Sequence, residues 1–484
     1  MKLLAFDYGA SSGRAIVGTF DGKKIELNEI HRFLNEPVQV NGVLYWDILR
    51  LYQELKNGLL KANSYDVDCM GIDTWGVDFA FLGKDGNMLA NPYHYRAKHT
   101  ENAIEEICKV LKREEIFAKT GLAFQPFNTL CQLYTMKNDG NPSYDVAKDA
   151  LFIPDLFNYF LTGNKVCEFT IASTSQLIKP GKNEWCDDIF NAYGIKNLFP
   201  EIVSAGTKIG SLRQGVMDEL QLSKSIPVIA TAEHDTGSAY VAVPAETENC
   251  AFLSSGTWSL LGCESDTPIL TKEALDAGYT NEGGVGNNIR FLKNIMGLWI
   301  IQECKRQWDK EGEVLSFQQI ADGAAQVEPC KFIINPDYKD FYSPFDMPNK
   351  IVKYCKETGG AVPTTKFEIA RCVYDSLALT YKHNLIKQEQ ILGKKIDVLH
   401  IVGGGANNVL LNIATADATG IKVTAGPTEG TALGNILTQL IAMGEIKDLK
   451  EARQIVRNST NIKEYLPKNT GAYEKGYERF LKLL

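Results

Sequence analysis

A pattern of apolar strand, small-residue loop and apolar strand occurs twice in this chain, and it constrains the fold more than any other feature. The first copy covers residues 3–19, where one apolar stretch ends at Asp7 and another begins after Arg14. Glycine lets a backbone approach a ligand closely, so the N–H groups of such a loop can turn toward an anion. The loop consists of Tyr8, Gly9, Ala10, Ser11, Ser12, Gly13 and Arg14. Alone, this segment is compatible with a phosphate-binding loop and equally with an ordinary β-hairpin.

The second copy decides between these alternatives. Residues 250–254 form a predicted strand, the turn follows at Ser255, Gly256 and Thr257, and a further apolar stretch covers 258–262. Self-similarity about half a chain apart indicates duplicated domains rather than a short solenoid repeat. Two such loops, one in each domain, resemble the arrangement of the actin-like ATPases.

Length and composition indicate a large folded protein without a nucleic-acid or membrane partner. A chain of 484 residues exceeds one compact core, which allows two or more domains. The formal charge is −8 and no run of Lys and Arg offsets it, which argues against nucleic-acid binding. No apolar stretch approaches the roughly 20 residues of a membrane helix. Asp7 interrupts the apolar N-terminal run too early for a signal peptide, so we expect a cytoplasmic protein.

The eleven cysteines are scattered, without a Cys-x-x-Cys pair or a short Cys/His spacing. An odd number in a chain of this size favours buried, reduced thiols over a disulfide framework or a zinc site. No residue pattern specifies an oligomeric state, and we expect a monomer.

Turn and cap signals place the elements of the first half. Asp21-Gly22 predicts a hairpin turn between strands at 15–20 and 24–32. Asp47 predicts the N-cap of an amphipathic helix. Further strands are expected at 67–72 and 225–232. Strands that alternate with amphipathic helices predict an α/β domain with helices on both sheet faces.

The second half shows the same alternation. Thr365 and Glu368 predict a capping box that opens a long helix, and Gly393 lies beyond its end. A strand at 397–402 leads into a triple-glycine turn at 403–405, with a helix expected from Asn407 or Asn408. The composition turns polar around residues 244–249. We therefore predict domains at 1–245 and 246–484.

The strongest candidate for reaction chemistry follows the strand at 225–232. Phosphoryl transfer to an alcohol needs a carboxylate beside the hydroxyl, to orient it and to take its proton. Asp235, flanked by His234 and Thr236 at the predicted strand end, suits this task. A structural hydrogen-bonded pair of His234 and Asp235 is the alternative, and a metal site is a weaker third. The glycine loops favour the catalytic interpretation.

Other candidates have two interpretations each. Asp7, at a strand end, suits a divalent cation that accompanies phosphates, held directly or through water. Asp73 and Asp78 could bind substrate, or they could be helix caps or solvated loop carboxylates. Asn294 is expected at a turn between a strand and a helix, where it could bind a ligand or cap the helix. The chain lacks G-x-x-x-x-G-K-[ST], and the triple glycine does not match G-x-G-x-x-G, so neither a P-loop ATPase nor a dehydrogenase is supported.

With these residues in place, the chain resembles the FGGY family of carbohydrate kinases from residue 4 to about residue 440. Asp7 and the glycine turns are shared with the wider superfamily. The segments around Trp75, His234 and Asn294 are more specific, and they are typical of members that act on L-rhamnulose. The matching segments are 10–14, 72–79, 233–237, 255–258, 293–299 and 403–405. The last ~40 residues match no motif that we can use.

The resemblance implies an α/β protein of two actin-like (ribonuclease H-like) domains, with a cleft between them for nucleotide and sugar. It implies ATP and Mg²⁺, the metal near Asp7 and held through water. Asp235 would be the base that acts on the 1-hydroxyl of L-rhamnulose, giving L-rhamnulose 1-phosphate. The residues implied to contact ATP are Ala10, Ser11, Ser12, Gly13, Arg14, Thr257, Gln302 and Gly404. Those implied to contact the sugar are Gly76, His234, Asp235, Thr236 and Asn294.

Two other functions stay open at this point. One is a kinase of the same fold for another ketose, such as L-fuculose, because epimers differ in a single hydroxyl that one or two side chains read. The other is a non-catalytic actin-like ATPase that acts as a sugar sensor or chaperone. Asp235 and the segment around Asn294 speak against the second.

Overall fold

The computed structural model describes all 484 residues, which divide into two compact units. Each unit is assembled from three separate stretches of sequence, so no single position divides them. Unit 1 comprises Met1–Ala242, Glu264–Phe291 and Gly430–Ser459, and unit 2 comprises Val243–Cys263, Leu292–Glu429 and Thr460–Leu484. The assignment of sugar binding to 1–245 and nucleoside binding to 246–484 stays a prediction.

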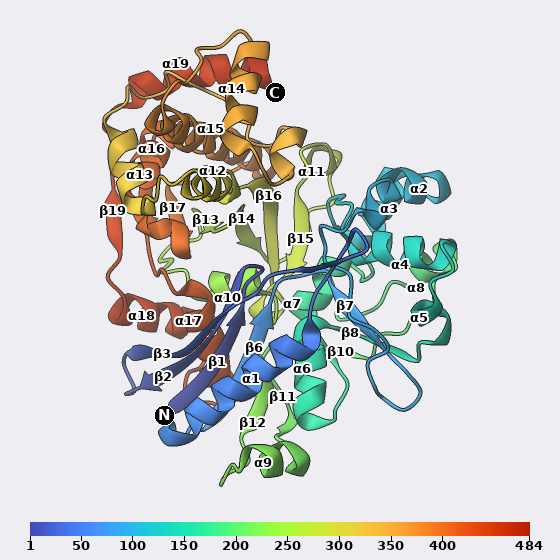
Figure 1. Cartoon of the computed structure of the whole chain (residues 1–484). Coiled ribbons are helices and arrows are strands. Elements are labelled where there is room, and N and C mark those ends of the chain that lie inside the picture. Colours follow the sequence, from blue (N-terminus) through green and yellow to red (C-terminus); the bar gives the residue numbers. More distant parts are fainter. The chain divides into compact units, whose positions relative to one another are not determined.

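Unit 1 is built around a six-stranded mixed sheet (Figure 1). Strand β1 pairs antiparallel with β2 and parallel with β6, which in turn is parallel to β12. In spatial order the strands are β11 (Thr207–Ser211), β12 (Pro227–Ala230), β6 (Cys69–Thr74), β1 (Lys2–Tyr8), β2 (Ser12–Phe20) and β3 (Ile25–Leu34). The first predicted hairpin and the Asp21-Gly22 turn are confirmed, whereas the strand expected at 67–72 begins two residues later.

The sheet of unit 2 repeats this topology. Strand β13 pairs antiparallel with β14 and parallel with β17, and β17 is parallel to β18. The sheet has seven strands, in the spatial order β15 (Thr280–Gly283), β16 (Ile289–Met296), β14 (Trp258–Ser265), β13 (Cys250–Ser255), β17 (Val398–Val402), β18 (Lys422–Ala425) and β19 (Lys463–Tyr465). The chain passes between the units within β14 and β16. The duplicated α/β fold, of the ribonuclease H-like type, is therefore confirmed.

Strand β1 shows why helices cover both faces of the unit 1 sheet. Its successive side chains point to opposite faces, as the period of two in a strand requires. Leu4, Phe6 and Tyr8 join one hydrophobic cluster, which includes α1 (Ile48–Ala62) and α6 (Ile153–Thr162). Leu3 and Ala5 join another, with α17 (Gly430–Ala442) and α18 (Leu449–Ser459). The predicted Asp47 cap is confirmed, because its side chain accepts a hydrogen bond from the Arg50 N–H.

The remaining elements of unit 1 surround this sheet or form a side layer. The helices are α2 (Ala103–Val110), α3 (Arg113–Thr120), α4 (Thr129–Asn138), α5 (Pro142–Val146), α7 (Phe169–Ala172), α8 (Asp187–Tyr193), α9 (Gln214–Leu220), α10 (Asp235–Val241) and α11 (Lys272–Asp276). The strands are β4 (Val38–Val40), β5 (Val43–Tyr45), β7 (Phe79–Leu82), β8 (Asp149–Phe152), β9 (Cys167–Glu168), β10 (Ile202–Val203) and β15 (Thr280–Gly283).

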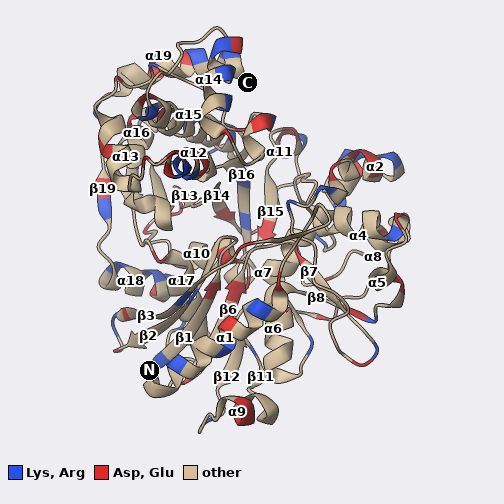
Figure 2. Cartoon of the chain, viewed as in Figure 1, with Lys and Arg blue, Asp and Glu red and all other residues tan.

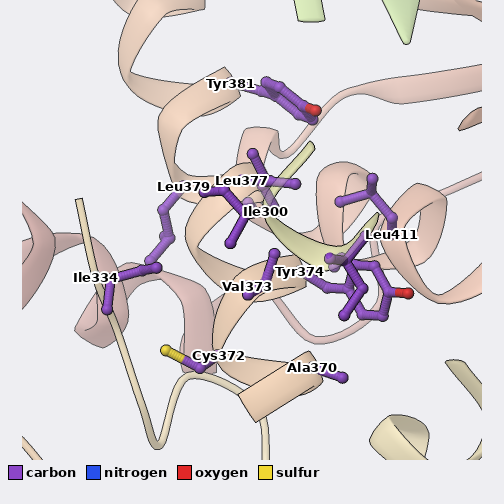
Figure 3. Close-up of a cluster of buried hydrophobic side chains, with 14 of the residues drawn as sticks. Ile300, Ile334, Ala370, Cys372, Val373, Tyr374, Leu377, Leu379, Tyr381 and Leu411 are labelled. Atoms are coloured by element: carbon purple, nitrogen blue, oxygen red, sulfur yellow. The ribbon is translucent and has the colours of Figure 1, made fainter. Parts of the chain in front are cut away.

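The long helix α15 (Lys366–Leu392) lies in the core of unit 2. Its capping box is present, since Thr365 and Glu368 each accept a hydrogen bond from the other's backbone N–H, and Gly393 ends it with a φ of 65°. Figure 3 shows its side chains Val373, Leu377 and Tyr381 in a buried cluster with residues of other helices. The whole cluster draws residues from α12 (Trp299–Lys310), α13 (Phe317–Ala325), α14 (Met347–Glu357), α16 (Val409–Thr419) and α19 (Thr470–Phe480).

Two local predictions are wrong. Asp235 is the first residue of helix α10 rather than the end of a strand. Asn294 lies inside strand β16 and not at a turn, because β16 continues to Met296 before α12 begins. The helix expected from Asn407 or Asn408 is confirmed as α16, which Asn408 caps by accepting from the Leu411 N–H.

The last forty residues, which sequence motifs left open, belong to both units. Helix α18 buries Ile455 and Val456 in unit 1, while β19 extends the sheet of unit 2 and α19 buries Tyr473 and Phe480 there. Ten of the eleven cysteines are buried, as predicted. None of the helices combines the length and the apolar character that crossing a membrane requires. Basic and acidic residues are interspersed over both units (Figure 2).

Removal of the α15 cap should lower the stability of unit 2. We expect Thr365→Ala to reduce the free energy of unfolding by about 1 kcal/mol, because the Glu368 N–H loses its acceptor. Urea unfolding followed by circular dichroism measures this. The control, Thr365→Ser, keeps the hydroxyl and should stay close to the parent protein; an equal loss in both variants would contradict the role of the cap.

Candidate active site

The first glycine loop joins β1 to β2 in unit 1, and hydrogen bonds fix its shape. The Gly9 N–H donates to the Ser12 carbonyl at 2.9 Å, and the Asn35 amide donates to the Gly9 carbonyl at 2.8 Å. The Arg14 guanidinium forms an ion pair with the Asp7 carboxylate. Gly13 has a packing role, because a Cβ there would lie 2.2 Å from the Phe33 ring.

Asp73 lies beside Asp7 on the neighbouring parallel strand, at the register position directly opposite. Its side chain is fully buried. One carboxylate oxygen, Oδ2, accepts a hydrogen bond of 2.6 Å from the Asn435 amide of α17, and the other has no partner. Burial raises the pKa of Asp73 well above its usual range, and the charge of Asp7 adds to this. Sequence motifs did not reveal Asn435, which lies more than 350 residues from Asp73 in the chain.

Asp235 is the first residue of helix α10, and it interacts electrostatically with Asp7 and Asp73. Its Oδ1 accepts hydrogen bonds from the Thr236 N–H at 2.5 Å and from the Thr236 hydroxyl at 3.1 Å. Burial raises the pKa of the Asp235 carboxyl and the nearby Asp7 carboxylate adds to the shift, whereas His234 and Thr236 oppose it. The side chain keeps 29% of its surface exposed, so it is accessible to a substrate. Asp235, His234, Thr236, Asp7 and Arg14 all belong to unit 1.

The backbone immediately before Asp235 is held by a buried glutamate. Glu168 Oε2 accepts from the Glu233 N–H at 3.1 Å and from the Thr170 hydroxyl at 2.5 Å. The Thr170 hydroxyl in turn accepts from the His234 N–H at 3.1 Å. The segment that carries Asp235 therefore has a fixed path. Glu168 and Thr170 could not be found from sequence, since only the fold places them beside residues 233–234.

The Asp78 carboxylate is structural, which excludes it as a substrate ligand. Its Oδ2 accepts from the Trp46 indole at 2.6 Å and the Trp75 indole at 3.1 Å, and its Oδ1 accepts from Gln132 at 3.0 Å. Trp75 stacks on Trp46 with ring centroids 3.9 Å apart. These contacts fix the loop that carries Gly76, where a Cβ would lie 3.0 Å from Thr174.

Three residues predicted to contact ATP, Thr257, Gln302 and Gly404, belong to unit 2. Thr257 lies in the second glycine loop, which joins β13 to β14. The Thr257 hydroxyl donates to the Gln302 side-chain oxygen at 3.3 Å. The triple-glycine turn packs against the same hairpin, because a Cβ on Gly405 would lie 1.9 Å from the Ser255 hydroxyl. Gly404, the middle glycine of the turn, is exposed, and a Cβ there would meet nothing within 4 Å. This leaves room for a ligand beside the Gly404 backbone.

Asn294 belongs to unit 2, whereas the other predicted sugar contacts belong to unit 1. Its side chain is half-buried on β16. Burial lowers the pKa of the neighbouring Lys293, and the Asp337 carboxylate opposes this shift. The structure therefore gives Asn294 a defined strand position within its own unit.

Family models match almost the whole chain. The N-terminal domain model of the FGGY family of carbohydrate kinases covers residues 2–242, and the C-terminal domain model covers residues 251–443. Together with the duplicated fold and the paired glycine loops, these matches define the class of protein. The chain belongs to the FGGY family of carbohydrate kinases.

Proteins with assigned names match this chain over nearly its full length. The chain is 43% identical over 482 residues to a protein of Bacteroides thetaiotaomicron named rhamnulokinase, with 99% of this chain and 98% of that protein covered. A rhamnulokinase of Bacillus subtilis is 42% identical, with 97% and 96% covered. Among solved structures, a xylulose kinase from Lactobacillus acidophilus shares the fold, with a TM-score of 0.82 at 16% identity and coverage of 100% and 97%.

The buried Asp78 carboxyl should make stability depend on pH. Burial raises its pKa to about 7, although its hydrogen bonds oppose this, whereas an unfolded Asp titrates near about 3.9. Between these values the folded state binds more protons, so this contribution to stability falls as the pH rises.

We expect the free energy of unfolding to decline less between about pH 5 and about pH 7 in Asp78→Asn than in the parent protein, by up to roughly 1.4 kcal/mol per pH unit. Urea unfolding across this range measures it. Parallel curves for the two proteins would show that Asp78 does not titrate there.

Proposed function

We propose that this protein transfers the terminal phosphoryl group of ATP to the 1-hydroxyl of L-rhamnulose, giving L-rhamnulose 1-phosphate in L-rhamnose catabolism. Membership of a carbohydrate kinase family supports the reaction type. The full-length similarity to proteins named rhamnulokinase supports the sugar. The single observation that carries the chemistry is the accessible Asp235 carboxylate, fixed at the start of α10 within the same unit as Asp7 and Arg14. A cytoplasmic location and a monomeric state stay predictions.

Asp235 would act as the general base. A carboxylate beside the hydroxyl orients the attacking oxygen and accepts its proton as the new P–O bond forms. The two Thr236 donors both meet Oδ1, which leaves Oδ2 for the sugar hydroxyl. We propose that Gly76, His234, Thr236 and Asn294 contact the same sugar. Alignment and charge stabilisation supply the catalysis, because phosphoryl transfer needs little covalent participation by the protein.

The two glycine loops would contact ATP. Thr257 and Gln302 already share a hydrogen bond, and Gly404 has an open face, so these residues suit the nucleotide. From unit 1, Ala10, Ser11, Ser12, Gly13 and Arg14 would contact the phosphates. That one ATP molecule meets both loops is part of the proposal, and the repeated hairpin supports it.

The residues near Asp7 fit a Mg²⁺ ion that enters with ATP. Mg²⁺ needs only one or two protein carboxylates when water and phosphates complete its shell. No group of three or more metal-ligating side chains is present, but the buried and unpartnered oxygen of Asp73 lies opposite Asp7 in the register. Asp7, through water, and Asp73 would hold the ion. When bound, Mg²⁺ would neutralise charge that develops on the phosphate oxygens.

A panel of ketoses tests the substrate. Purified protein with ATP should give the fastest turnover with L-rhamnulose, and ³¹P NMR should place the phosphate on O1. Faster turnover of L-fuculose or another ketose would replace the proposed sugar. ATP hydrolysis without any phosphorylated sugar would instead favour the non-catalytic sensor.

Asp235→Asn should separate binding from turnover. We expect kcat to fall by roughly 10²- to 10⁴-fold, because the amide cannot accept the proton. The Kd for L-rhamnulose, measured by calorimetry, should change by less than about threefold, since the shape is kept and threefold is under about 1 kcal/mol. Near-normal turnover would refute Asp235 as the base.

A substitution at Gly404 tests nucleotide binding, because the fold has room for a side chain at this position. Gly404→Leu should raise the KM for ATP by roughly tenfold or more, about 1.4 kcal/mol, and leave the KM for the sugar unchanged. The matched control is Gly471→Leu on α19, which also meets nothing within 4 Å. Unchanged ATP kinetics in Gly404→Leu would place the nucleoside elsewhere.

A further inference from the structure

The His234 imidazole lies between the Asp235 carboxylate and a buried arginine. Its Nε2 is 3.5 Å from Asp235 Oδ1, and its Nδ1 is 3.1 Å from the Arg290 Nη2. A guanidinium group has five N–H donors and no acceptor. Glu282 Oε2 also lies 3.2 Å from Nδ1, but it makes no hydrogen bond in this structure, whereas the Arg290 contact is one, so Nδ1 accepts the hydrogen bond from Arg290. A neutral imidazole carries one proton, so this proton is on Nε2, the nitrogen that faces Asp235.

Arg290 is itself fixed in place. Only 1% of its side chain is exposed, its Nε donates to the Gly283 carbonyl at 2.7 Å, and its Nη2 lies 3.2 Å from Glu282 Oε2. Burial would raise the pKa of Glu282, but the charge of Arg290 is the largest opposing effect, and this pKa lies below its usual value. Glu282 is thus an anion that keeps the guanidinium beside His234.

We propose that Glu282 and Arg290 are positioning residues for the reaction, which act through His234 on the Asp235 carboxylate. By holding the Nε2–H tautomer, they direct a third donor at Asp235 Oδ1, beside the two from Thr236. The two Thr236 hydrogen bonds and the Nε2–H, 3.5 Å away, then face one carboxylate oxygen, and the other stays available to the sugar hydroxyl. The catalytic part of this proposal rests on the proposed function, in which Asp235 is the base.

The two residues come from an unexpected part of the chain. Glu282 lies on β15 and Arg290 on β16, both within the stretch that the C-terminal family model covers. In space, however, the stretch 264–291 belongs to unit 1 together with His234 and Asp235. We therefore infer that this stretch completes the surroundings of the base.

The tautomer of His234 gives a direct test that requires no substrate. In protein labelled with ¹⁵N-histidine, long-range ¹H–¹⁵N correlation spectra distinguish Nδ1–H from Nε2–H rings, and His234→Gln identifies the signal among the six histidines. We expect the Nε2–H pattern in the parent protein. Arg290→Met removes the donor, so the Glu282 carboxylate, 3.2 Å from Nδ1, should draw the ring proton to Nδ1. Arg290→Lys, which keeps a donor, should restore the parent pattern.

An Nδ1–H ring in the parent protein, or an unchanged ring in Arg290→Met, would overturn the proposal. Arg290→Met leaves the Glu282 carboxylate buried without its partner and can prevent folding. In that case the variant Arg290→Met with Glu282→Leu, which removes both buried charges, serves instead. It should lose the exclusive Nε2–H pattern, and retention of that pattern would overturn the proposal.

Kinetics test the coupling to Asp235. We expect Arg290→Met to lower kcat by roughly 10- to 100-fold, as a misplaced reacting group does, with the KM for ATP unchanged. In the His234→Gln background the same substitution should have no further effect on kcat. An equal loss in both backgrounds would indicate a merely structural role and overturn the proposal.

The matched control is Arg371→Gln, which breaks a buried arginine–carboxylate pair with Asp375 in unit 2. It should lower stability and leave the His234 ring unchanged. If no ketose is phosphorylated at all, the proposed function fails while the tautomer result still decides the structural claim.

Discussion

The close approach of three carboxylates, Asp7, Asp73 and Asp235, is the constraint on which the site in unit 1 depends. Like charges brought together in a region of low dielectric repel one another, and burial alone already disfavours the anions of Asp73 and Asp235. Hydrogen-bond donors and a cation beside the three carboxylates offset this repulsion. Arg14 pairs with Asp7, Asn435 donates to Asp73, and Thr236 and His234 face Asp235. These partners come from β2, from α17 and from the start of α10. A cation that arrives with ATP would relieve the remaining charge.

The fold supplies this arrangement through one topology used twice. In both sheets the first strand has an antiparallel partner on one side and a parallel partner on the other. A glycine turn links the first strand to its antiparallel partner in each case. In unit 1 the strand ends carry acids, whereas in unit 2 the corresponding turn carries Thr257 and meets the triple glycine. The same topology thus carries different side chains at the corresponding loops of the two units.

Much of this was predictable from local sequence. Strand–turn–strand patterns, the Asp47 cap, the Thr365–Glu368 capping box and the Gly393 stop depend on neighbouring residues, so they can be read without the fold. The role of Asp235 stays a prediction, and its expected placement at a strand end is wrong, since Asp235 itself opens a helix. Asn294 was misplaced because β16 extends further than its apolar run indicates. Asp78 has the same residue type as Asp235, and only its four buried donors identify it as structural.

The sequence by itself determined the class of fold, the duplication and the segments proposed for the chemistry, because periodicity, caps and glycine turns act over a few residues. Tertiary structure alone decided which distant residues surround them. Asn435, Glu168, Glu282 and Arg290 carry no local signal of function. Asn435 meets Asp73, Glu168 meets the backbone of Glu233, and Glu282 and Arg290 meet His234 only when separate stretches of chain fold into one unit. Hydrogen bonds and ion pairs act over a few ångströms in space, whatever the separation along the chain. The partners of a buried charge therefore become visible only in the folded molecule.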